Sequence, residues 1–144
     1  MSLINPYLMF NGNCLEAFNF YKSVFDGEFI SIQKFKDLPP SEDFKIDAKF
    51  GDRIMHITLP INKEKDNVLM GCDSNPEYGE VPVVSNITLS FSADSKSIAD
   101  KVFSSLSEGG KVSMPLADTF WGSYFGMCED KFGTSWMVSF DKSK

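Results

Sequence analysis

Long hydrophobic runs are missing from this 144-residue chain. No stretch approaches the roughly 18 apolar residues that a transmembrane helix needs, and residues 2–10 lack the basic start and apolar centre of a secretory signal. We therefore expect no membrane partner. A chain of this length fits one domain that buries roughly two-thirds of the surface exposed on unfolding, so its core needs no cross-link.

Cysteine is also scarce. Cys14, Cys72 and Cys128 form no Cys-x-x-Cys pair, and their number is odd. A chain cross-linked by disulfides would have an even number of cysteines at short spacings. We therefore expect reduced thiols and a cytoplasmic location. No basic cluster stands beside any of them in the sequence, and we interpret all three as structural.

Positive charge is in deficit. Fourteen lysines and arginines stand against 20 aspartates and glutamates, which gives a formal net charge of −6, and the basic residues are scattered. A nucleic-acid backbone would be repelled at long range, so we expect no nucleic-acid partner. Aromatic residues, by contrast, make up 14% of the chain, which favours a heavily packed core or an apolar pocket.

An internal repeat is the strongest pattern that the chain does contain. Four apolar residues with the i, i+3, i+4, i+7 spacing of an amphipathic helix occur twice, at a constant offset of 82 residues. The two sets are Ala17, Phe20, Tyr21 and Val24, and Ala99, Val102, Phe103 and Leu106. Gly27 and Gly109 keep the same offset and are expected to end the two helices in a left-handed conformation. The sequence therefore predicts a duplicated module.

The first half of the chain is predicted to run strand, helix and then further strands. We expect the helix to begin after Asn13, as an N-cap in a capping box with Glu16, and to end near Phe25. Residues 37–43 are rich in proline and charge and are expected to form a surface loop. The predicted strands are 4–10, 28–36, 46–50, 53–61 and 67–72.

The second half restarts the same order. Asp94 or Ser95 is expected to cap a helix that ends at Ser107, and residues 115–122 are expected to form a loop that carries Asp118 and Trp121. The predicted strands are 86–91, 111–114, 124–128 and 135–140. Both halves can be written βαβββ, although the first half offers one strand candidate more than this order needs. We predict one α+β domain of two modules, about 1–73 and 84–144, with a linker over about 74–83.

Several motifs in a fixed order resemble those of PhnB-like proteins, which are also labelled 3-demethylubiquinone-9 3-methyltransferase-like. The matching stretches are residues 6–14, Ala17, residues 20–22, Met55-His56, Leu69-Met70 with Asp73, residues 118–126, Phe132-Gly133 and residues 135–137. The resemblance implies the vicinal oxygen chelate superfamily and its glyoxalase/bleomycin resistance/dioxygenase fold. In that fold two βαβββ modules form a cupped mixed sheet, usually completed in a homodimer. The methyltransferase label finds no support, because no glycine-rich nucleotide turn follows a predicted strand.

Metal-dependent members of that superfamily place histidine and glutamate ligands on the first and last strand of each module, as the resemblance implies. The residues here at the matching places are Asn5, Tyr7, Met9, Leu69, Met70, Asn86, Thr88, Ser90 and Met137. None is a histidine, aspartate or glutamate, and a thioether is a weak ligand for a hard divalent ion. We therefore expect no metal site and no cofactor, although a divalent metal on ligands outside this set is a possible alternative.

His56 is the single histidine of the chain, so it is the candidate for any imidazole chemistry. Two interpretations stay open: a half-buried sheet residue satisfied by its neighbours, or a hydrogen-bonding group or general base for a ligand. Seven further residues are expected to line the ligand site: Tyr7, Met9, Met70, Asp118, Trp121, Tyr124 and Met137. For the methionines the alternative is ordinary core packing, and for Asp118 it is the capping of a turn.

These observations give a leading functional hypothesis and two alternatives. The leading one is a homodimeric, metal-free protein that binds or sequesters a small organic molecule in an apolar cup. The first alternative is a glyoxalase-like lyase or isomerase that uses a divalent metal or His56. The second is a structural dimer whose cup is filled by its own side chains.

Overall fold

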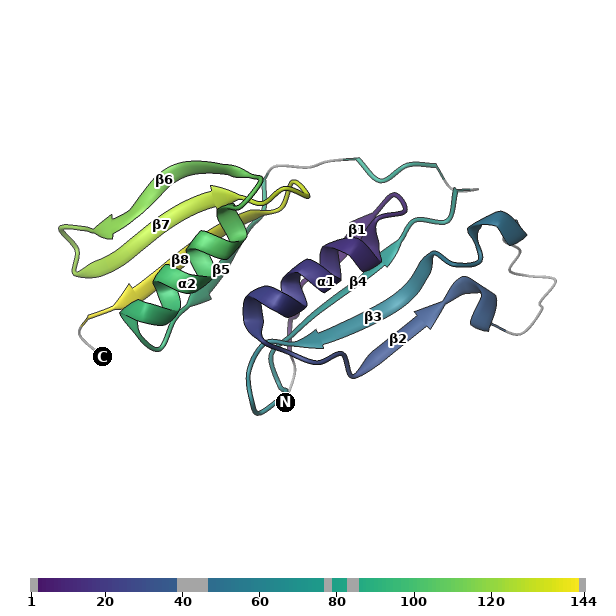
Figure 1. The fold of residues 1–144 in the computed structure, drawn as a ribbon, viewed down its shortest axis with the longest axis horizontal. Coiled ribbons are helices and arrows are strands. Elements are labelled where there is room, and N and C mark those ends of the chain that lie inside the picture. Colours follow the sequence, from purple (N-terminus) through teal and green to yellow (C-terminus); the bar gives the residue numbers. More distant parts are fainter. Residues whose placement is uncertain (1–2, 39–46, 77–78, 83–85, 143–144) are drawn as a thin grey trace. The chain divides into compact units, whose positions relative to one another are not determined.

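The computed structural model describes residues 3–38, 47–76, 79–82 and 86–142. These residues belong to two compact units, Met1–Pro82 and Val83–Lys144 (Figure 1). The boundary between the units falls within the linker expected over 74–83. Within the described residues each unit contains one α-helix and one four-stranded mixed sheet.

The first unit has the element order βαβββ. Its elements are β1 (Tyr7–Phe10), α1 (Cys14–Phe25), β2 (Ser31–Lys34), the 3₁₀ turns η1 (Phe35–Asp37) and η2 (Ala48–Phe50), β3 (Ile54–Pro60) and β4 (Val68–Asp73). The strand order across the sheet is β1-β4-β3-β2. Strand β1 runs parallel to β4, and the other neighbours are antiparallel.

The second unit repeats this topology. Its elements are β5 (Thr88–Ser92), α2 (Lys96–Ser107), β6 (Lys111–Asp118), β7 (Ser123–Glu129) and β8 (Ser135–Asp141). The strand order is β5-β8-β7-β6, with β5 parallel to β8. Because both units share one element order and one pattern of strand pairing, the predicted duplication and the α+β fold are confirmed.

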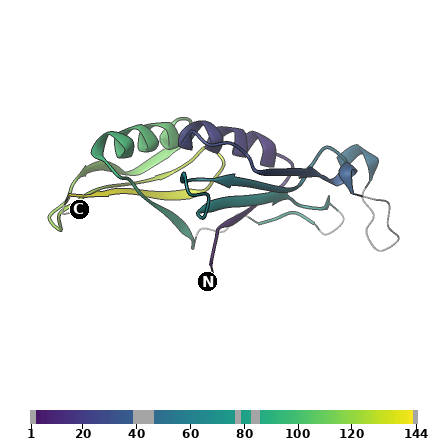
Figure 2. The ribbon, with the colours of Figure 1, turned by 90° about the horizontal axis from the view of Figure 1, so that it is seen from below.

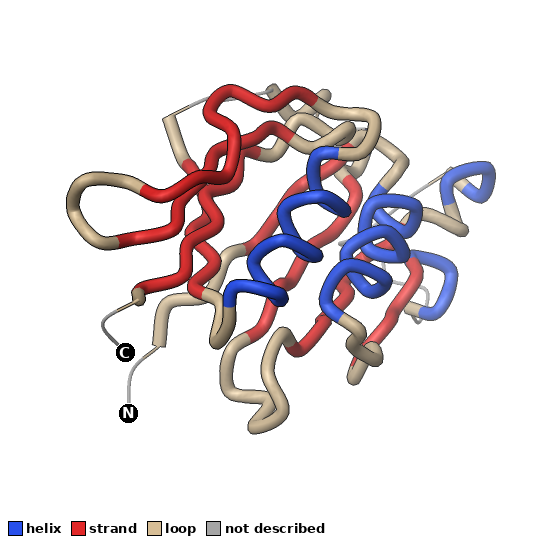
Figure 3. The backbone as a smooth tube through the Cα atoms, turned by 60° about the vertical axis from the view of Figure 1, so that its left-hand side comes forward, coloured by secondary structure: helices blue, strands red, loops and turns tan. Residues whose placement is uncertain are grey.

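Each helix covers one face of the sheet in its own unit, as the views in Figures 2 and 3 show. The predicted stripe of α2, Ala99, Val102, Phe103 and Leu106, is buried throughout. In α1 the buried residues are Cys14, Ala17, Phe18, Tyr21 and Val24. Phe18 therefore takes the core position that the repeat assigned to Phe20, which is only half-buried.

One glycine in each unit lets the helix approach its sheet. A Cβ atom on Gly71 would lie 2.6 Å from Cε1 of Phe18, and one on Gly126 would lie 2.9 Å from Cε2 of Phe103. Gly71 and Gly126 therefore face α1 and α2, respectively. Because side chains alternate along a strand, the residues on either side of each glycine face away from the helix.

The start of α1 depends on a residue far away in the sequence. Asn13 precedes the helix but makes no side-chain cap hydrogen bond, so the predicted capping box is wrong. Asp73, only 2% exposed, accepts the backbone N–H groups of Gly12 and Cys14 on Oδ1 and that of Ile54 on Oδ2, each at 2.9 Å. The carboxylate thus joins the end of β4 to the helix start and to β3.

The helix ends and caps agree with the sequence in part. Asp26, with φ 52°, takes the left-handed position that was expected of Gly27. Gly109, with φ 76°, does adopt a left-handed conformation after α2. Ser95 is the N-cap of α2 and accepts the N–H of Ile98 at 3.2 Å, as predicted.

Two other predicted elements differ from the structure. The strand expected over 46–50 is wrong, because Ala48–Phe50 forms a 3₁₀ turn whose Lys49 N–H binds the side chain of Asp47; Ile46 lies outside the described residues, as do residues 39–43 of the predicted loop. The loop expected over 115–122 is shorter, because β6 continues to Asp118. Among the described helices, none has the length and apolar character that crossing a membrane requires.

Candidate functional site

The face of the first sheet that points away from α1 carries a group of hydrogen-bonded polar side chains. Gly71 pairs with Leu8 and Ile57 and faces the helix with them, so the alternate positions face the other way. We call these residues the open face of the first sheet. They are Tyr7, Met9, Ser31, Gln33, His56, Thr58, Pro60, Val68, Met70 and Cys72.

A chain of hydrogen bonds crosses this open face. Nε2 of His56 lies 2.8 Å from Oγ1 of Thr58, and Nδ1 of His56 lies 3.4 Å from the hydroxyl oxygen of Tyr7. The rings of Tyr7 and His56 are tilted by 37°, with centroids 5.8 Å apart. Tyr7 also hydrogen-bonds with Cys72. Four side chains from three strands therefore form one connected network.

Burial fixes the protonation of two members of this network. Desolvation, helped by the hydrogen bond with Cys72, raises the pKa of Tyr7 to about 12. Desolvation also raises the pKa of the Cys72 thiol, against the opposing effect of the hydrogen bond from Tyr7. Tyr7 therefore remains a phenol and Cys72 a thiol at neutral pH, and neither adds charge to the open face.

The structure brings four of the sequence-predicted residues together on this face. Tyr7 and Met70 are register partners, and Met9 pairs with Cys72 next to them. Tyr7 and Met9 are 44% and 52% exposed, so a ligand can reach both. His56 lies on the neighbouring strand β3 in contact with Tyr7.

Sequence reasoning missed two members of the network, Thr58 and Cys72. Both lie two residues from a residue that had been singled out, Thr58 after His56 and Cys72 after Met70. A strand places positions i and i+2 on the same face, so this spacing was the available signal.

The second sheet has a face of different character. Gly126 faces α2, so the face pointing away from α2 holds the alternate residues and their register partners. They are Thr88, Ser90, Ser92, Lys111, Met114, Ala117, Ser123, Phe125, Met127, Glu129, Ser135, Met137, Ser139 and Asp141. Met137 is thus on this face, and Trp121 stacks against Phe125 at a centroid distance of 5.9 Å.

The two remaining predicted residues make contacts elsewhere in the second unit. Tyr124 shares the parity of Gly126, and its hydroxyl donates to Asp100 of α2 at 2.5 Å, with the Lys96 ammonium 4.6 Å from its ring. The hydrogen bond to Asp100 raises the pKa of Tyr124. Asp118 forms an ion pair with Lys142 at 2.5 Å. Tyr124 therefore attaches α2 to the sheet. The negative charge of Asp118 is balanced by the ammonium group of Lys142, the residue after β8.

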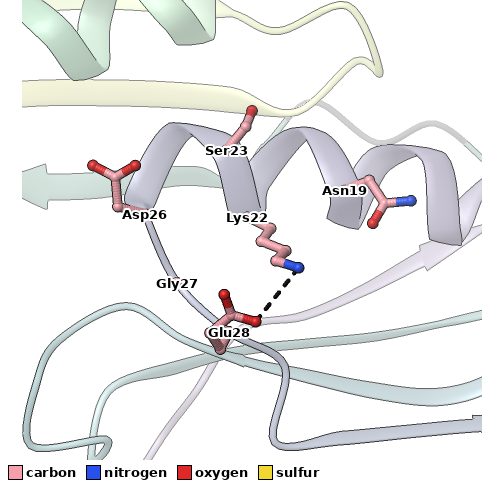
Figure 4. Close-up of a pocket in the computed structure, with 6 residues that line it drawn as sticks. All are labelled: Asn19, Lys22, Ser23, Asp26, Gly27 and Glu28. Carbon is pink, nitrogen blue, oxygen red and sulfur yellow. Dashed lines mark ion pairs between the residues drawn. The ribbon is translucent and has the colours of Figure 1, made fainter.

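A shallow pocket of about 470 Å³ lies at the C-terminal end of α1 (Figure 4). Its lining residues are Asn19, Lys22, Ser23, Asp26, Gly27 and Glu28. Lys22 and Glu28 form an exposed ion pair at 3.5 Å across it. None of the sequence-predicted site residues lines this pocket, and two of its charged groups, Lys22 and Glu28, already pair with each other.

The fold defines the class of protein. Two βαβββ modules with a parallel pair between the first and last strands are the glyoxalase/bleomycin resistance fold of the vicinal oxygen chelate superfamily. FosX, a fosfomycin resistance protein from Listeria monocytogenes, shares this fold with a TM-score of 0.61 over 95% of this chain and 91% of FosX, at 11% identity.

The family follows from closer matches. The chain belongs to the PhnB-like family described as 3-demethylubiquinone-9 3-methyltransferase, whose model matches residues 2–139. Protein YjdN of Escherichia coli is 29% identical over 98% of this chain and 97% of YjdN. PA1353 of Pseudomonas aeruginosa is 38% identical, with a TM-score of 0.82 over 98% of each chain. A putative 3-demethylubiquinone-9 3-methyltransferase, the PhnB protein of Bacillus cereus, is 27% identical, with a TM-score of 0.74 over 96% of this chain and 99% of that protein.

One solved form of FosX is complexed with Mn(II), an ion that prefers carboxylate, carbonyl and water ligands. The described residues of the open face of the first sheet offer a different set of groups, which does not fit such an ion. The open face of the first sheet offers thioethers, a thiol and one imidazole whose two nitrogens already have partners. Throughout the part of the chain that the structure describes, no three histidine, cysteine, aspartate or glutamate side chains gather in one place.

Proposed function

We propose that this protein binds a small organic molecule against the open face of the first sheet, without a metal ion. The connected network of Tyr7, His56, Thr58 and Cys72 carries this proposal. Small-molecule sites combine an apolar surface with a few well-placed polar groups. Met9 and Met70 provide the apolar part beside the network, and an unbranched thioether adapts to ligands of different shape.

The two parts of the face would do different work. Apolar contact with the methionines would supply affinity at about 25 cal/mol per Å² of surface removed from water. The network would orient the ligand through one or two hydrogen bonds, because Thr58 and Cys72 hold the His56 and Tyr7 side chains in place. The soft and mostly satisfied donors on the face support the metal-free form of the proposal.

Methionine methyl NMR on the full chain tests this proposal. The seven methionines give separate ¹³C-methyl signals that single substitutions can assign, and the single histidine gives one set of imidazole signals. We expect a panel of small aromatic and aliphatic compounds to contain members that shift the Met9, Met70 and His56 signals saturably. Met9→Lys should abolish these shifts, because it places a charge on the apolar part of the face.

Ile87→Lys is the matched control, since Ile87 is also an exposed apolar residue but lies outside the open face. It should leave the shifts unchanged. The proposal is wrong if no compound perturbs Met9 and Met70, or if Met9→Lys and Ile87→Lys behave alike. Extraction and mass spectrometry of the protein purified without added ligand would show directly which molecule it holds.

A further inference from the structure

The open face of the first sheet carries none of the permanently charged groups found elsewhere in the unit. Its side chains include no carboxylate, ammonium or guanidinium group. Lys34, the last residue of β2, lies beyond a register shift between β2 and β3 and is not part of this set. Other charged groups of the first unit pair away from this face: Lys22 with Glu28, Lys36 with Asp52, and Arg53 with the carbonyl of Ser74.

The two acidic groups of this face, Tyr7 and Cys72, add no charge around neutral pH. The raised pKa values of Tyr7 and Cys72 keep both groups protonated. A ligand with a formal charge would lose water at this face and find no opposite charge to replace it, which costs free energy. An uncharged ligand avoids that cost.

Tyr7 is the donor best placed to meet such a ligand. It is 44% exposed, and its oxygen lies 3.4 Å from Nδ1 of His56. Hydrogen bonds from a hydroxyl group are normally about 2.5–3.0 Å long, so this contact is loose. Its other partner, the Cys72 thiol, is a weak acceptor. The hydroxyl can therefore turn from both towards a ligand while His56 keeps its shorter bond to Thr58.

We propose that the ligand is an uncharged, mainly apolar molecule with a carbonyl or similar acceptor oxygen, which receives a hydrogen bond from Tyr7. This inference rests on the proposed function and adds the ligand's chemical class to it. Met9 and Met70 contact the apolar body, and the phenol of Tyr7 selects the oxygen. Anionic and cationic analogues of the same shape bind more weakly.

Four probes with one naphthalene body test this inference: acetonaphthone, ethylnaphthalene, naphthoate and naphthylmethylammonium. Titrations of the full chain are followed by the Met9 and Met70 methyl signals. Acetonaphthone should bind at least about tenfold more tightly than either charged probe, which corresponds to about 1.4 kcal/mol. Acetonaphthone should also bind more tightly than ethylnaphthalene, which has the same two-carbon substituent but lacks the acceptor oxygen.

Tyr7→Phe separates hydrogen bonding from packing. It should weaken acetonaphthone binding by about three- to tenfold, the usual range for one neutral hydrogen bond, and leave ethylnaphthalene binding unchanged. Tyr124→Phe is the matched control, because it removes a phenol that contacts Asp100 in the second unit. It should change neither affinity.

The outcomes distinguish this inference from the proposed function. If naphthoate or naphthylmethylammonium binds as tightly as acetonaphthone, the neutral-ligand inference is overturned while binding at the face stands. If Tyr7→Phe weakens both neutral probes equally or neither of them, the donor role of Tyr7 is overturned. If none of the four probes moves the Met9 and Met70 signals, the proposed function itself fails.

Discussion

The open face of the first sheet places a phenol, a thiol and an imidazole in one network, and desolvation shifts the pKa of the phenol and of the thiol. Withdrawal from water disfavours the ionised form of a phenol or thiol, which is why the pKa values of Tyr7 and Cys72 both rise. The same effect raises the pKa of Cys14 and Cys128 in the core. At the residue scale, the surroundings of the Tyr7 phenol and of the three cysteine thiols therefore favour their neutral forms.

Alkaline pH should expose this effect at Tyr7. Its pKa is about 12 in the folded chain against 10.0 ordinarily, so the unfolded chain loses the phenol proton first. The stabilising contribution is complete below pH 10 and is lost as pH rises towards 12. The free energy of unfolding, measured by urea denaturation at a series of pH values between 10 and 12, should fall less steeply with rising pH for Tyr7→Phe than for the unchanged chain. Parallel curves for the two proteins would contradict this assignment.

Sequence reasoning could find Tyr7, Met9 and Met70 because strand positions follow from alternation and from the motif order. The i+2 spacing could have pointed to Thr58 and Cys72, but the contact of Tyr7 with His56 depends on the pairing of both β1 and β3 with β4, which the sequence does not give. Likewise Tyr124 and Asp118 were expected near a ligand, but their contacts are with Asp100 and Lys142. One amino-acid sequence by itself does not reveal which partner a polar side chain contacts on a neighbouring strand or helix.

At the scale of elements, helix periodicity predicted more than local capping signals did. Both helices were expected with the correct ends, because an apolar stripe reports burial over three turns. The capping box of Asn13 failed because Asp73, distant in sequence, supplies the acceptor instead. The strand expected over 46–50 failed because a short apolar stretch carries little periodicity, and Asp47 stabilises a turn there.

Close contact between α1 and β4 should depend on Gly71. In Gly71→Ala the new methyl group would meet Cε1 of Phe18 at 2.6 Å and the carbonyl oxygen of Leu8 at 2.7 Å. We expect overpacking to cost about 1–3 kcal/mol in urea unfolding. Phe18→Leu in the same chain should recover part of this loss, which appears as a coupling above about 0.5 kcal/mol in a double-mutant cycle.

Cys72→Ala is the control for that cycle, because it alters the adjacent residue on the opposite face of β4 and introduces no clash with α1. It should show no coupling with Phe18→Leu. A stability of Gly71→Ala within about 0.5 kcal/mol of the unchanged chain would show that the helix is free to move away from the sheet, contrary to this account.

At the scale of the whole molecule, exposed apolar side chains raise the question of a partner. Phe120 and Trp121, at the turn between β6 and β7, are 96% and 54% exposed and pack edge-to-face with centroids 4.9 Å apart. Met114 of β6 is 41% exposed in the same hairpin. Large contiguous apolar patches are uncommon on monomeric proteins and often mark interaction sites. The homodimer that the family resemblance implies would account for these residues.

Sedimentation velocity tests this prediction on the full chain, whose mass is 16.2 kDa. We expect the species at micromolar concentration to have twice that mass. Phe120→Ser should shift it towards the monomer because it removes a large apolar contact from the hairpin tip, whereas Ile4→Ser, at another fully exposed apolar position, should not. A purely monomeric chain would rule out the dimer, and a dimer unaffected by Phe120→Ser would place its interface away from this hairpin.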